Sequence, residues 1–356
     1  MSATPPATPA APAAAAPAAA GPAPAATAAA AIDGDYSAIN QAKADFSAIY
    51  VQPDPRAYFR TLGALGYGIP HLARPVFEQL IAARRQARLA AGEDATVTVL
   101  DLGCSYGVNA ALMKYALGYD QLIERYDLMA QQQAGPDDML RLDRHYYAAW
   151  PQRPDIRVIG LDVSGPAVRY AESCGILDAG IVADLESEDP GAEAAALLSG
   201  IDLIVSTGCV GYVTSRSFRR LADLCIAAGR EAPWVASFVL RMFDYGDIAQ
   251  VLKRHGLVTQ KFEGATFVQR RFRDEEEMRG TLEALSARGL SAAGKEADGL
   301  FHAELFFSRP QAESEARPIN RLVSVTSGVN RNYGRRPRLP QRPVRNVRPA
   351  RPAIMA

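Results

Sequence analysis

A glycine turn after the first strongly apolar run is the clearest place in this chain for ligand chemistry. Residues 97–113 read VTVLDLGCSYGVNAALM, typical of a buried strand, a tight turn and the start of a helix. A dinucleotide site needs G-x-G-x-x-G, because its middle glycine lets the backbone approach a pyrophosphate. Here Ser105 stands between Gly103 and Gly107, and no G-K-S/T follows, which excludes a P-loop. The turn therefore suits a nucleoside-like ligand without a pyrophosphate. Asn109 stands at the position of a third glycine, and at a helix start it is expected to bond a backbone group or a ligand carboxylate.

Two carboxylates follow later strand-like runs. Asp162 ends the run in IRVIGLDVS, and Asp184 ends the next one, in GIVADL. A carboxylate at a strand end suits the paired hydroxyls of a ribose, because its oxygens accept two hydrogen bonds. A dinucleotide-type count of about 20 residues beyond the glycines reaches Asp120 or Glu124, which end no strand, so Asp162 is preferred. Each acid alone is also compatible with a helix cap or an ordinary loop, but their joint occurrence favours a site.

The elements that position these residues alternate between short apolar runs and amphipathic stretches, from about residue 45 to 310. The runs are rich in β-branched and aromatic residues, as buried strands are. Alternation with short connections predicts a mostly parallel sheet with helices on both faces. The last two runs are hairpin-like and predict an antiparallel edge. The seven runs occupy residues 96–103, 156–164, 180–185, 201–208, 234–243, 259–272 and 301–309.

Over about residues 95–310 this series resembles the class I S-adenosylmethionine-dependent methyltransferases. The resemblance rests on the turn from Asp101 to Gly107, the acids Asp162 and Asp184, and a fourth strand that reads DLIVSTG. It implies an α/β, Rossmann-like fold with a seven-stranded, mostly parallel sheet and an antiparallel C-terminal edge strand. It also implies S-adenosyl-L-methionine as the cofactor.

The resemblance assigns a role to each matching residue. Gly103 and Gly107 would form the turn under the methionine end, and Asp101 would orient the amino group, directly or through water. Asp162 would hold the ribose, and Asp184 the adenine. Other residues of these motifs complete the expected cofactor set: Ser105, Asn109, Val163, Leu185, Ser206 and Thr207.

The sequence identifies the residues that would bind the methyl acceptor less clearly. S-adenosylmethionine already carries an activated methyl group, so the protein has mainly to position a nucleophile and exclude water. The fourth strand runs into STGCVGYVT and lacks the Asn/Asp-Pro-Pro-aromatic signature of nucleic-acid base and protein-glutamine methylation, which favours a small-molecule acceptor. Tyr212 follows the fourth strand and Arg241 ends the fifth, so both are expected near the pocket mouth. With His145 they are the candidate catalytic residues. Further acceptor-side candidates are His71, Tyr146, Cys209 and Tyr245.

These acceptor-side candidates have structural alternatives. The alternative for the histidines is an ordinary surface or helix-packing role, and for Cys209 it is that of a small buried residue. No metal site is expected, because the four cysteines have no CxxC spacing and the four histidines are scattered.

Two segments lie outside the alternation. Residues 37–92 look helical and are expected to form a possible substrate lid before a methyltransferase domain at 93–310. A polar helical insertion at 119–152 is expected to join that cover. The alternative is that both segments only pack against the domain and have no role in binding. Aromatic residues of the lid that would face the substrate are Tyr58, Phe59 and Tyr67.

The two ends have a different composition. Residues 1–31 hold 18 Ala, 7 Pro and no charge, so residues 1–36 are expected to be disordered. Residues 311–356 are also expected to be disordered, with ten Arg and no Lys or acid from Arg317 on. The chain has 39 basic and 39 acidic residues, so residues 1–316 carry 29 against 39, a net of −10. Such a tail suits RNA or an anionic membrane surface, or it lies on its own acidic body.

Composition also narrows the class of protein. With no export signal, no apolar run of 18 residues and no cysteine framework, we expect a cytoplasmic protein without a transmembrane segment. Two alternatives stay open: an RNA or protein methyltransferase that uses the basic tail, and a non-catalytic S-adenosylmethionine-binding or interaction domain. A nicotinamide oxidoreductase is disfavoured by the missing middle glycine.

Overall fold

The computed structural model describes Met1, residues 36–40 and residues 43–325. Those from Tyr36 to Val325 belong to one compact unit. The disorder expected for residues 1–36 falls almost entirely outside the described residues, as does that expected for most of 311–356.

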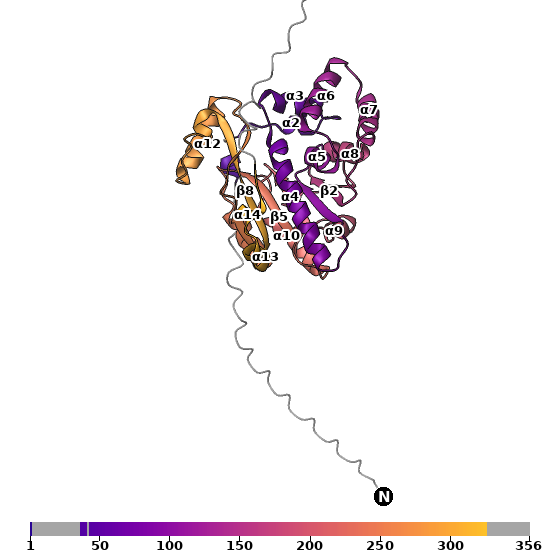
Figure 1. The fold of residues 1–356 in the computed structure, drawn as a ribbon, viewed down its shortest axis with the longest axis vertical. Helices are drawn as coiled ribbons and strands as arrows, with labels where there is room; N and C mark the ends of the chain where they lie inside the picture. The colour runs from indigo at the N-terminus through magenta and orange to yellow at the C-terminus, as the bar shows by residue number, and fades with distance from the viewer. Residues whose placement is uncertain (2–35, 41–42, 326–356) are drawn as a thin grey trace, which may run out of the picture. The chain divides into compact units, whose positions relative to one another are not determined.

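One mixed sheet forms the centre of this unit (Figure 1). Its strand order is β3-β2-β1-β4-β5-β8-β6, and β7 also pairs with β8. The first five strands are mutually parallel, whereas β8 runs antiparallel to β5, β6 and β7. The predicted Rossmann-like α/β class is therefore confirmed. The strands are β1 (Val97–Leu102), β2 (Ile156–Asp162), β3 (Ala179–Val182), β4 (Leu203–Thr207), β5 (Trp234–Leu240), β6 (Leu257–Lys261), β7 (Phe267–Arg271) and β8 (Leu300–Pro310).

Two short strands, β6 and β7, share the edge of the sheet beyond β8. Strand β6 pairs with the second half of β8 and β7 with its first half, so eight strands fill seven positions. The run expected at 259–272 is thus two strands, interrupted at 262–266 and irregular between Val268 and Arg270. The antiparallel strand β8 lies one position inside the edge, because β6 and β7 cover its outer side.

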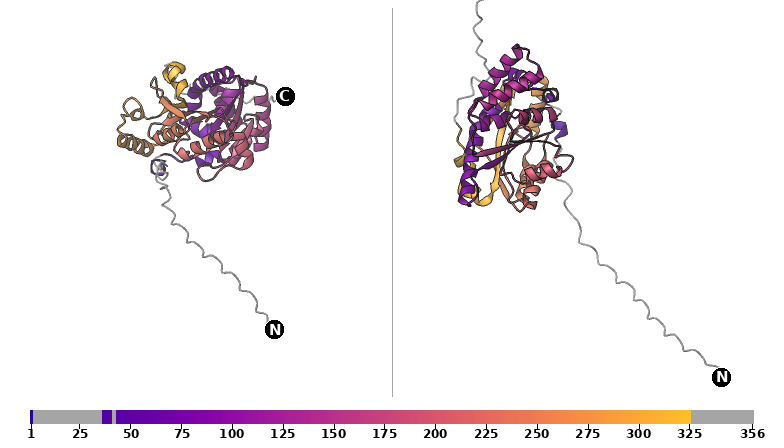
Figure 2. Two further views of the ribbon diagram at one scale, coloured as in Figure 1. Left: turned by 90° about the horizontal axis from the view of Figure 1, so that it is seen from below. Right: turned by 90° about the vertical axis from the view of Figure 1, so that its right-hand side faces the viewer.

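Helices cover both faces of the sheet (Figure 2). Alternate residues of β1 divide between two apolar clusters: Val99 belongs to the cluster with α4 and α8, and Leu100 to the cluster with α10 and α11. This alternation buries both faces, as a parallel sheet requires. The covering helices are α4 (Ile69–Ala90), α5 (Val108–Lys114), α8 (Gly165–Ser173), α9 (Ala192–Leu198), α10 (Ser215–Ala227) and α11 (Gly246–Arg254).

The N-terminal helices and the insertion gather at one end of the sheet (Figure 1). The ring of Phe59 stacks on that of Tyr126, with 4.4 Å between centroids, which joins α3 to α6. The fully buried Asp143 of α7 accepts hydrogen bonds from Arg125 of α6 and from the hydroxyl of Tyr170 of α8. These helices are α1 (Ser37–Asn40), α2 (Ser47–Tyr50), α3 (Arg56–Ala64), α6 (Tyr119–Gln131) and α7 (Pro136–Ala148).

The folded chain continues beyond residue 310. Helix α12 (Glu275–Ala287) and the 3₁₀ helix η1 (Glu296–Asp298) precede β8, and the short helices α13 (Gln311–Ala316) and α14 (Ile319–Leu322) follow it. Ile319 and Leu322 are buried in the core. The described residues 311–325 therefore correct the expected start of the C-terminal tail, because these apolar side chains have a core to pack against.

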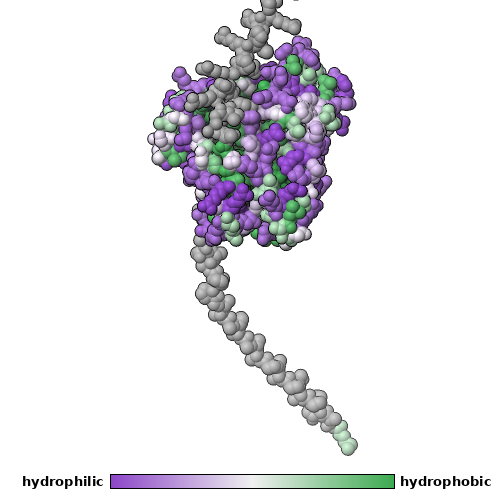
Figure 3. Space-filling view, viewed as in Figure 1, coloured by the Kyte–Doolittle hydropathy of each residue, from purple (hydrophilic) through white to green (hydrophobic). Residues whose placement is uncertain are grey.

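The face of the molecule in Figure 3 is mainly hydrophilic, with apolar residues in scattered patches. Large exposed apolar residues occur on separate elements, for example Leu89 on α4, Leu128 on α6 and Ile226 on α10. Single exposed apolar residues of this kind are normal for a globular surface.

Replacing Asp143 tests whether the insertion is part of the cooperative fold. Asp143→Ala leaves the guanidinium of Arg125, 14% exposed, without its carboxylate and removes an acceptor from Tyr126 and Tyr170. We expect a loss of about 3–5 kcal/mol in the free energy of unfolding in urea. The control Asp138→Ala, on the same helix, breaks an exposed pair with Arg141 and is expected to cost less than about 1 kcal/mol. Equal, small losses for both variants would contradict this role.

Candidate active site

A cavity of about 440 Å³ lies at the carboxyl ends of β1, β2 and β4, a size suited to a small-molecule ligand. The loops after these strands and after β3 form one wall. The N-terminal residues 43–51 and strand β7 form the other. Open α/β sheets commonly bind ligands at this edge.

The glycine turn adopts a backbone that few residues tolerate. Gly103, Ser105 and Gly107 have φ angles of 74°, 50° and 73°, in the left-handed region. A Cβ on Gly103 would lie 2.7 Å from that of Cys209, and one on Gly107 would lie 2.7 Å from Cγ2 of Ile176. Gly103 and Ser105 line the cavity, but Gly107 does not. Gly107 thus allows close packing beneath the turn, and its own atoms do not line the cavity.

Asp162 lies at the carboxyl end of β2, on the wall of the cavity. Its Oδ2 accepts a hydrogen bond from the backbone N–H of Ser105 (2.8 Å), and its Oδ1 accepts one from that of Ser164 (2.9 Å). Burial raises its pKa. Each carboxylate oxygen keeps a second lone pair for a ligand hydroxyl. Val163, 67% exposed, extends the same wall.

Asp184 and Leu185 line the cavity from the loop after β3, which ends at Val182. The carboxylate of Asp184 accepts hydrogen bonds from the N–H of Glu186 (3.0 Å) and the hydroxyl of Ser187 (2.8 Å). These local bonds fix its orientation. The acids after the second and third strands therefore meet at one cavity, although they are 22 residues apart in the sequence.

A buried polar network lies beneath the turn. The amide nitrogen of Asn109 donates to Oδ1 of Asp101 (3.2 Å) and to the hydroxyl of Thr207 (3.0 Å). Asp101 is fully buried, and this burial, with the nearby Asp162, raises its pKa to about 7. Asn109 and Thr207 line the cavity, whereas Asp101 does not. Asp101 therefore reaches the cavity only through the side chain of Asn109.

Several polar atoms of this network have no hydrogen-bond partner among the described residues. They are Oδ1 of Asn109, Oγ of Ser105, Oδ2 of Asp101 and Oγ of Ser206. The first two belong to side chains that line the cavity, whereas Ser206 is fully buried and does not line it. Buried polar groups are normally paired, so the unpaired atoms beside the cavity fit a ligand that supplies donors there.

Only one of the three candidate catalytic residues lines the cavity in the described structure. Tyr212 lies at its rim and is 58% exposed. Arg241 is buried in an ion pair with Glu296 (2.5 Å), away from the cavity. His145 lies on the exposed face of α7, where its Nδ1 is 2.7 Å from the carbonyl oxygen of Arg141. The expectation for Arg241 and His145 is corrected, because each side chain is oriented by a partner elsewhere.

Of the four other acceptor-side candidates, one lines the cavity and three do not. Cys209 lines the cavity, and burial raises the pKa of its thiol to about 12, so it is not a thiolate nucleophile. Tyr245 stacks on Phe306 in the core. His71 and Tyr146 do not line the cavity either.

Two of the three lid aromatics face the cavity. Tyr58 and Tyr67 line it, whereas Phe59 turns away to stack on Tyr126. Burial raises the pKa of Tyr67 to about 12, and hydrogen bonding to Thr207 and Tyr58 partly opposes this.

Residues 43–51, part of the segment 37–92 that was expected to form a lid, build the second wall through contacts that were not anticipated. The hydroxyl of Tyr106 donates to the carbonyl oxygens of Ile49 (3.1 Å) and Gln52 (2.8 Å). The hydroxyl of Ser164 donates to the carbonyl oxygen of Tyr50 (2.5 Å). The loops after β1 and β2 therefore hold this segment over the cavity. Most of these contacts go to backbone atoms, which leave no signal in residue type.

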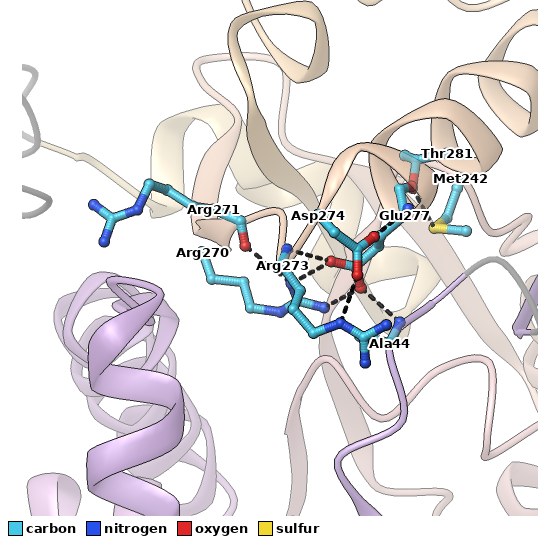
Figure 4. Close-up of polar contacts among 8 residues, drawn as sticks. All are labelled: Ala44, Met242, Arg270, Arg271, Arg273, Asp274, Glu277 and Thr281. Atoms are coloured by element: carbon cyan, nitrogen blue, oxygen red, sulfur yellow. Dashed lines mark hydrogen bonds and ion pairs between the residues drawn. The ribbon is translucent and has the colours of Figure 1, made fainter.

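The carboxylate of Glu277 joins that segment to β7 (Figure 4). It accepts hydrogen bonds from both terminal nitrogens of Arg270, at 2.6 and 2.8 Å. It also accepts them from the backbone N–H groups of Ala44 (2.7 Å) and Arg273 (2.8 Å). Although burial opposes it, hydrogen bonding from Arg270 and from the backbone lowers the pKa of Glu277. Such bidentate, charge-assisted bonds are strong and directional. They orient Arg270, which lines the cavity with its neighbour Gln269.

Within residues 36–40 and 43–325, no group of three or more His, Cys, Asp or Glu side chains is arranged to hold a metal ion. No helix in this part of the chain has the length and apolarity needed to cross a membrane.

No protein-family model matches the chain, and comparison with curated proteins finds no match. Solved structures do show similarity. A TehB-like methyltransferase from Corynebacterium glutamicum is 17% identical, with 65% of this chain and 98% of that one aligned and a TM-score of 0.30. The plantazolicin methyltransferase BpumL, solved with SAH, is 12% identical over 78% and 95%, with a TM-score of 0.36. The magnesium protoporphyrin IX methyltransferase of Synechocystis, solved with SAM, is 12% identical over 77% and 90%, with a TM-score of 0.30.

The raised pKa of Asp101 predicts a pH-dependent stability. Between its ordinary pKa of 3.8 and its folded value of about 7, the folded protein holds a proton that the unfolded chain has lost. Stability therefore falls through this range as the pH rises. Relative to Asp101→Asn, the wild type should lose about 2–3 kcal/mol of unfolding free energy between pH 5 and pH 8.

Urea unfolding of both proteins at the two pH values measures this difference. Asp137→Asn, in the exposed first turn of α7, controls for the loss of one carboxylate. A difference between wild type and Asp101→Asn that stays constant from pH 5 to pH 8 would rule out the raised pKa.

Proposed function

We propose that this protein binds S-adenosylmethionine in the cavity and transfers its methyl group to a small-molecule acceptor. The observation that carries the proposal is the convergence of the two-glycine turn, Asp162 and Asp184 on one cavity. The unpaired polar atoms of Asn109 and Ser105 at that cavity support it. The residue pattern of the class I methyltransferases gives these positions their proposed roles.

Each residue of the first wall has a binding role in this proposal. Asp162 accepts hydrogen bonds from the ribose hydroxyls through its remaining lone pairs. Asp184 accepts one from the adenine amino group. Asn109 bonds the methionine end, with Asp101 orienting its amide from below. Gly103 lets the ligand approach the backbone closely, because it has no Cβ.

The second wall positions the acceptor. S-adenosylmethionine supplies an activated methyl group on a sulfonium, so the chain has to align a nucleophile and keep water out. The side chains of Tyr50, Tyr58 and Tyr67 line this half of the cavity. Tyr67, with a pKa of about 12, serves at neutral pH as a hydrogen-bond donor and not as a base. Tyr212 is the one candidate catalytic residue that this proposal retains, at the rim.

A small acceptor is favoured over RNA or protein by the cover that residues 43–51 place on the cavity. The arginine-rich residues that would hold an anionic macromolecule lie almost entirely outside the described part of the chain. A cavity that extends beyond the proposed cofactor residues, into a separate aromatic half, favours catalysis over cofactor binding alone.

Calorimetric titration tests the cofactor. We expect S-adenosylmethionine to bind and NADH not to bind. Asp162→Asn should weaken the binding of S-adenosylmethionine by about 1–3 kcal/mol, because one acceptor oxygen becomes a donor group. Asp155→Asn, just before the opposite end of β2, is the matched control and should leave the affinity unchanged. Tight binding of NADH without S-adenosylmethionine, or equal affinity in Asp162→Asn, contradicts the proposal.

A further inference from the structure

Lys43 places an unbalanced positive charge at the acceptor half of the cavity. Its ammonium nitrogen lies 4.3 Å from the ring centroid of Tyr212 and 5.4 Å from that of Phe243. Within the described part of the chain, no carboxylate oxygen lies within 4 Å of it, the limit for an ion pair. Burial first, and then the nearby Arg270, lowers its pKa to about 8, so most of it stays protonated at neutral pH.

The second cation of this half is already neutralised. Both terminal nitrogens of Arg270 bond the carboxylate of Glu277, at 2.6 and 2.8 Å. Its guanidinium also lies over the rings of Phe46 (5.0 Å) and Phe301 (4.7 Å). With Lys43, Arg270 and Glu277 counted together, one positive charge remains.

The carboxylates that line the cavity have other partners. Glu186 accepts hydrogen bonds from Thr214 and Ser217, on the side of α10. Asp45 is exposed and accepts bonds from the backbone and hydroxyl of Ser47. Asp162 and Asp184 belong to the proposed cofactor half. Among the described residues the charge on Lys43 therefore has no carboxylate partner, and the rings of Tyr212 and Phe243 supply only a weak cation–π attraction.

We propose that the methyl acceptor is an anionic aromatic small molecule, with a carboxylate or phenolate oxygen paired to the ammonium of Lys43. This rests on the proposed function. Phe46, Tyr50 and Tyr58 offer rings against which the aromatic body packs, and edge-to-face contacts of this kind already join Tyr50 and Tyr58. A partly buried ion pair is stronger than an exposed one, so the charge selects the anion over its neutral analogue. Lys43 is a positioning residue in this scheme.

Matched anionic and neutral probes test the charge selection. Benzoate and benzamide are titrated calorimetrically into the protein saturated with S-adenosylhomocysteine. We expect benzoate to bind about tenfold more tightly, which is about 1.4 kcal/mol. Lys43→Met should abolish this preference, whereas Lys43→Arg should retain most of it. Lys253→Met, on the exposed side of α11, controls for net charge and should behave as wild type.

A second experiment tests whether the acceptor oxygen is a phenolate. The ionisation of 4-nitrophenol is visible, so its pKa is measured free and bound. Wild type should lower the bound pKa, and Lys43→Met should not. A preference for benzoate alone indicates a carboxylate acceptor, and a lowered nitrophenol pKa alone indicates a phenolate.

The inference is overturned if benzamide binds as well as benzoate and nitrophenol is unshifted, if neither probe binds, or if Lys43→Met keeps the preference. The affinity for S-adenosylhomocysteine is measured separately in every variant and should not change. Failure of S-adenosylhomocysteine to bind wild type, while Lys43-dependent binding of benzoate persists, would overturn the proposed function and leave the anion site intact.

Discussion

The hydrogen bond from the backbone of Ser105 to Asp162 is the interaction on which the cavity depends. The turn holds three residues in the left-handed region within five positions, and one of them is not glycine. Such a backbone persists only where its surroundings stabilise it. The carboxylate at the end of β2 supplies that support from the neighbouring strand. The same side chain therefore fixes the turn and faces the cavity.

A second carboxylate performs the corresponding task on the opposite wall. Glu277 bonds Arg270 on β7 and the N–H of Ala44 in the N-terminal segment, so two segments 226 residues apart meet at one group. Without it, Arg270 would be a buried, unpaired cation and the segment would lose an anchor. Because these bonds occupy the oxygens of Glu277, its carboxylate forms no ion pair with Lys43.

The sequence predicted the sheet and the first wall because their determinants are local. A strand run followed by glycine or aspartate marks the carboxyl end of a parallel strand, and topology brings such ends together. Asp162 and Asp184 were found in this way. The same reasoning failed for Arg241, which also ends a strand, because η1 offers it Glu296. No strand pattern reports that partner, which is 55 residues further along the chain.

The sequence indicated a lid within residues 37–92, but the residues and contacts that build the second wall could not be predicted, for a related reason. Residues 43–51 have no periodic apolar pattern. The hydroxyls of Tyr106 and Ser164 donate to their backbone carbonyls, and the carboxylate of Glu277 accepts from a backbone N–H. Lys43 reads as an ordinary surface lysine in the sequence. Only its placement against Tyr212, with no carboxylate beside it in the described residues, distinguishes it.

The two halves form one cavity because small residues let the glycine turn, the loop after β4 and strand β7 approach closely. A Cβ on Gly208 would lie 2.3 Å from the amide nitrogen of Gln269, and one on Gly103 would lie 2.7 Å from the Cβ of Cys209. The loop after β4 therefore packs between the glycine turn and β7. Thr207, the last residue of β4, accepts a hydrogen bond from Asn109, and Thr207 and Tyr67 both line the cavity. Residues 207–209 thus lie against both walls of the cavity.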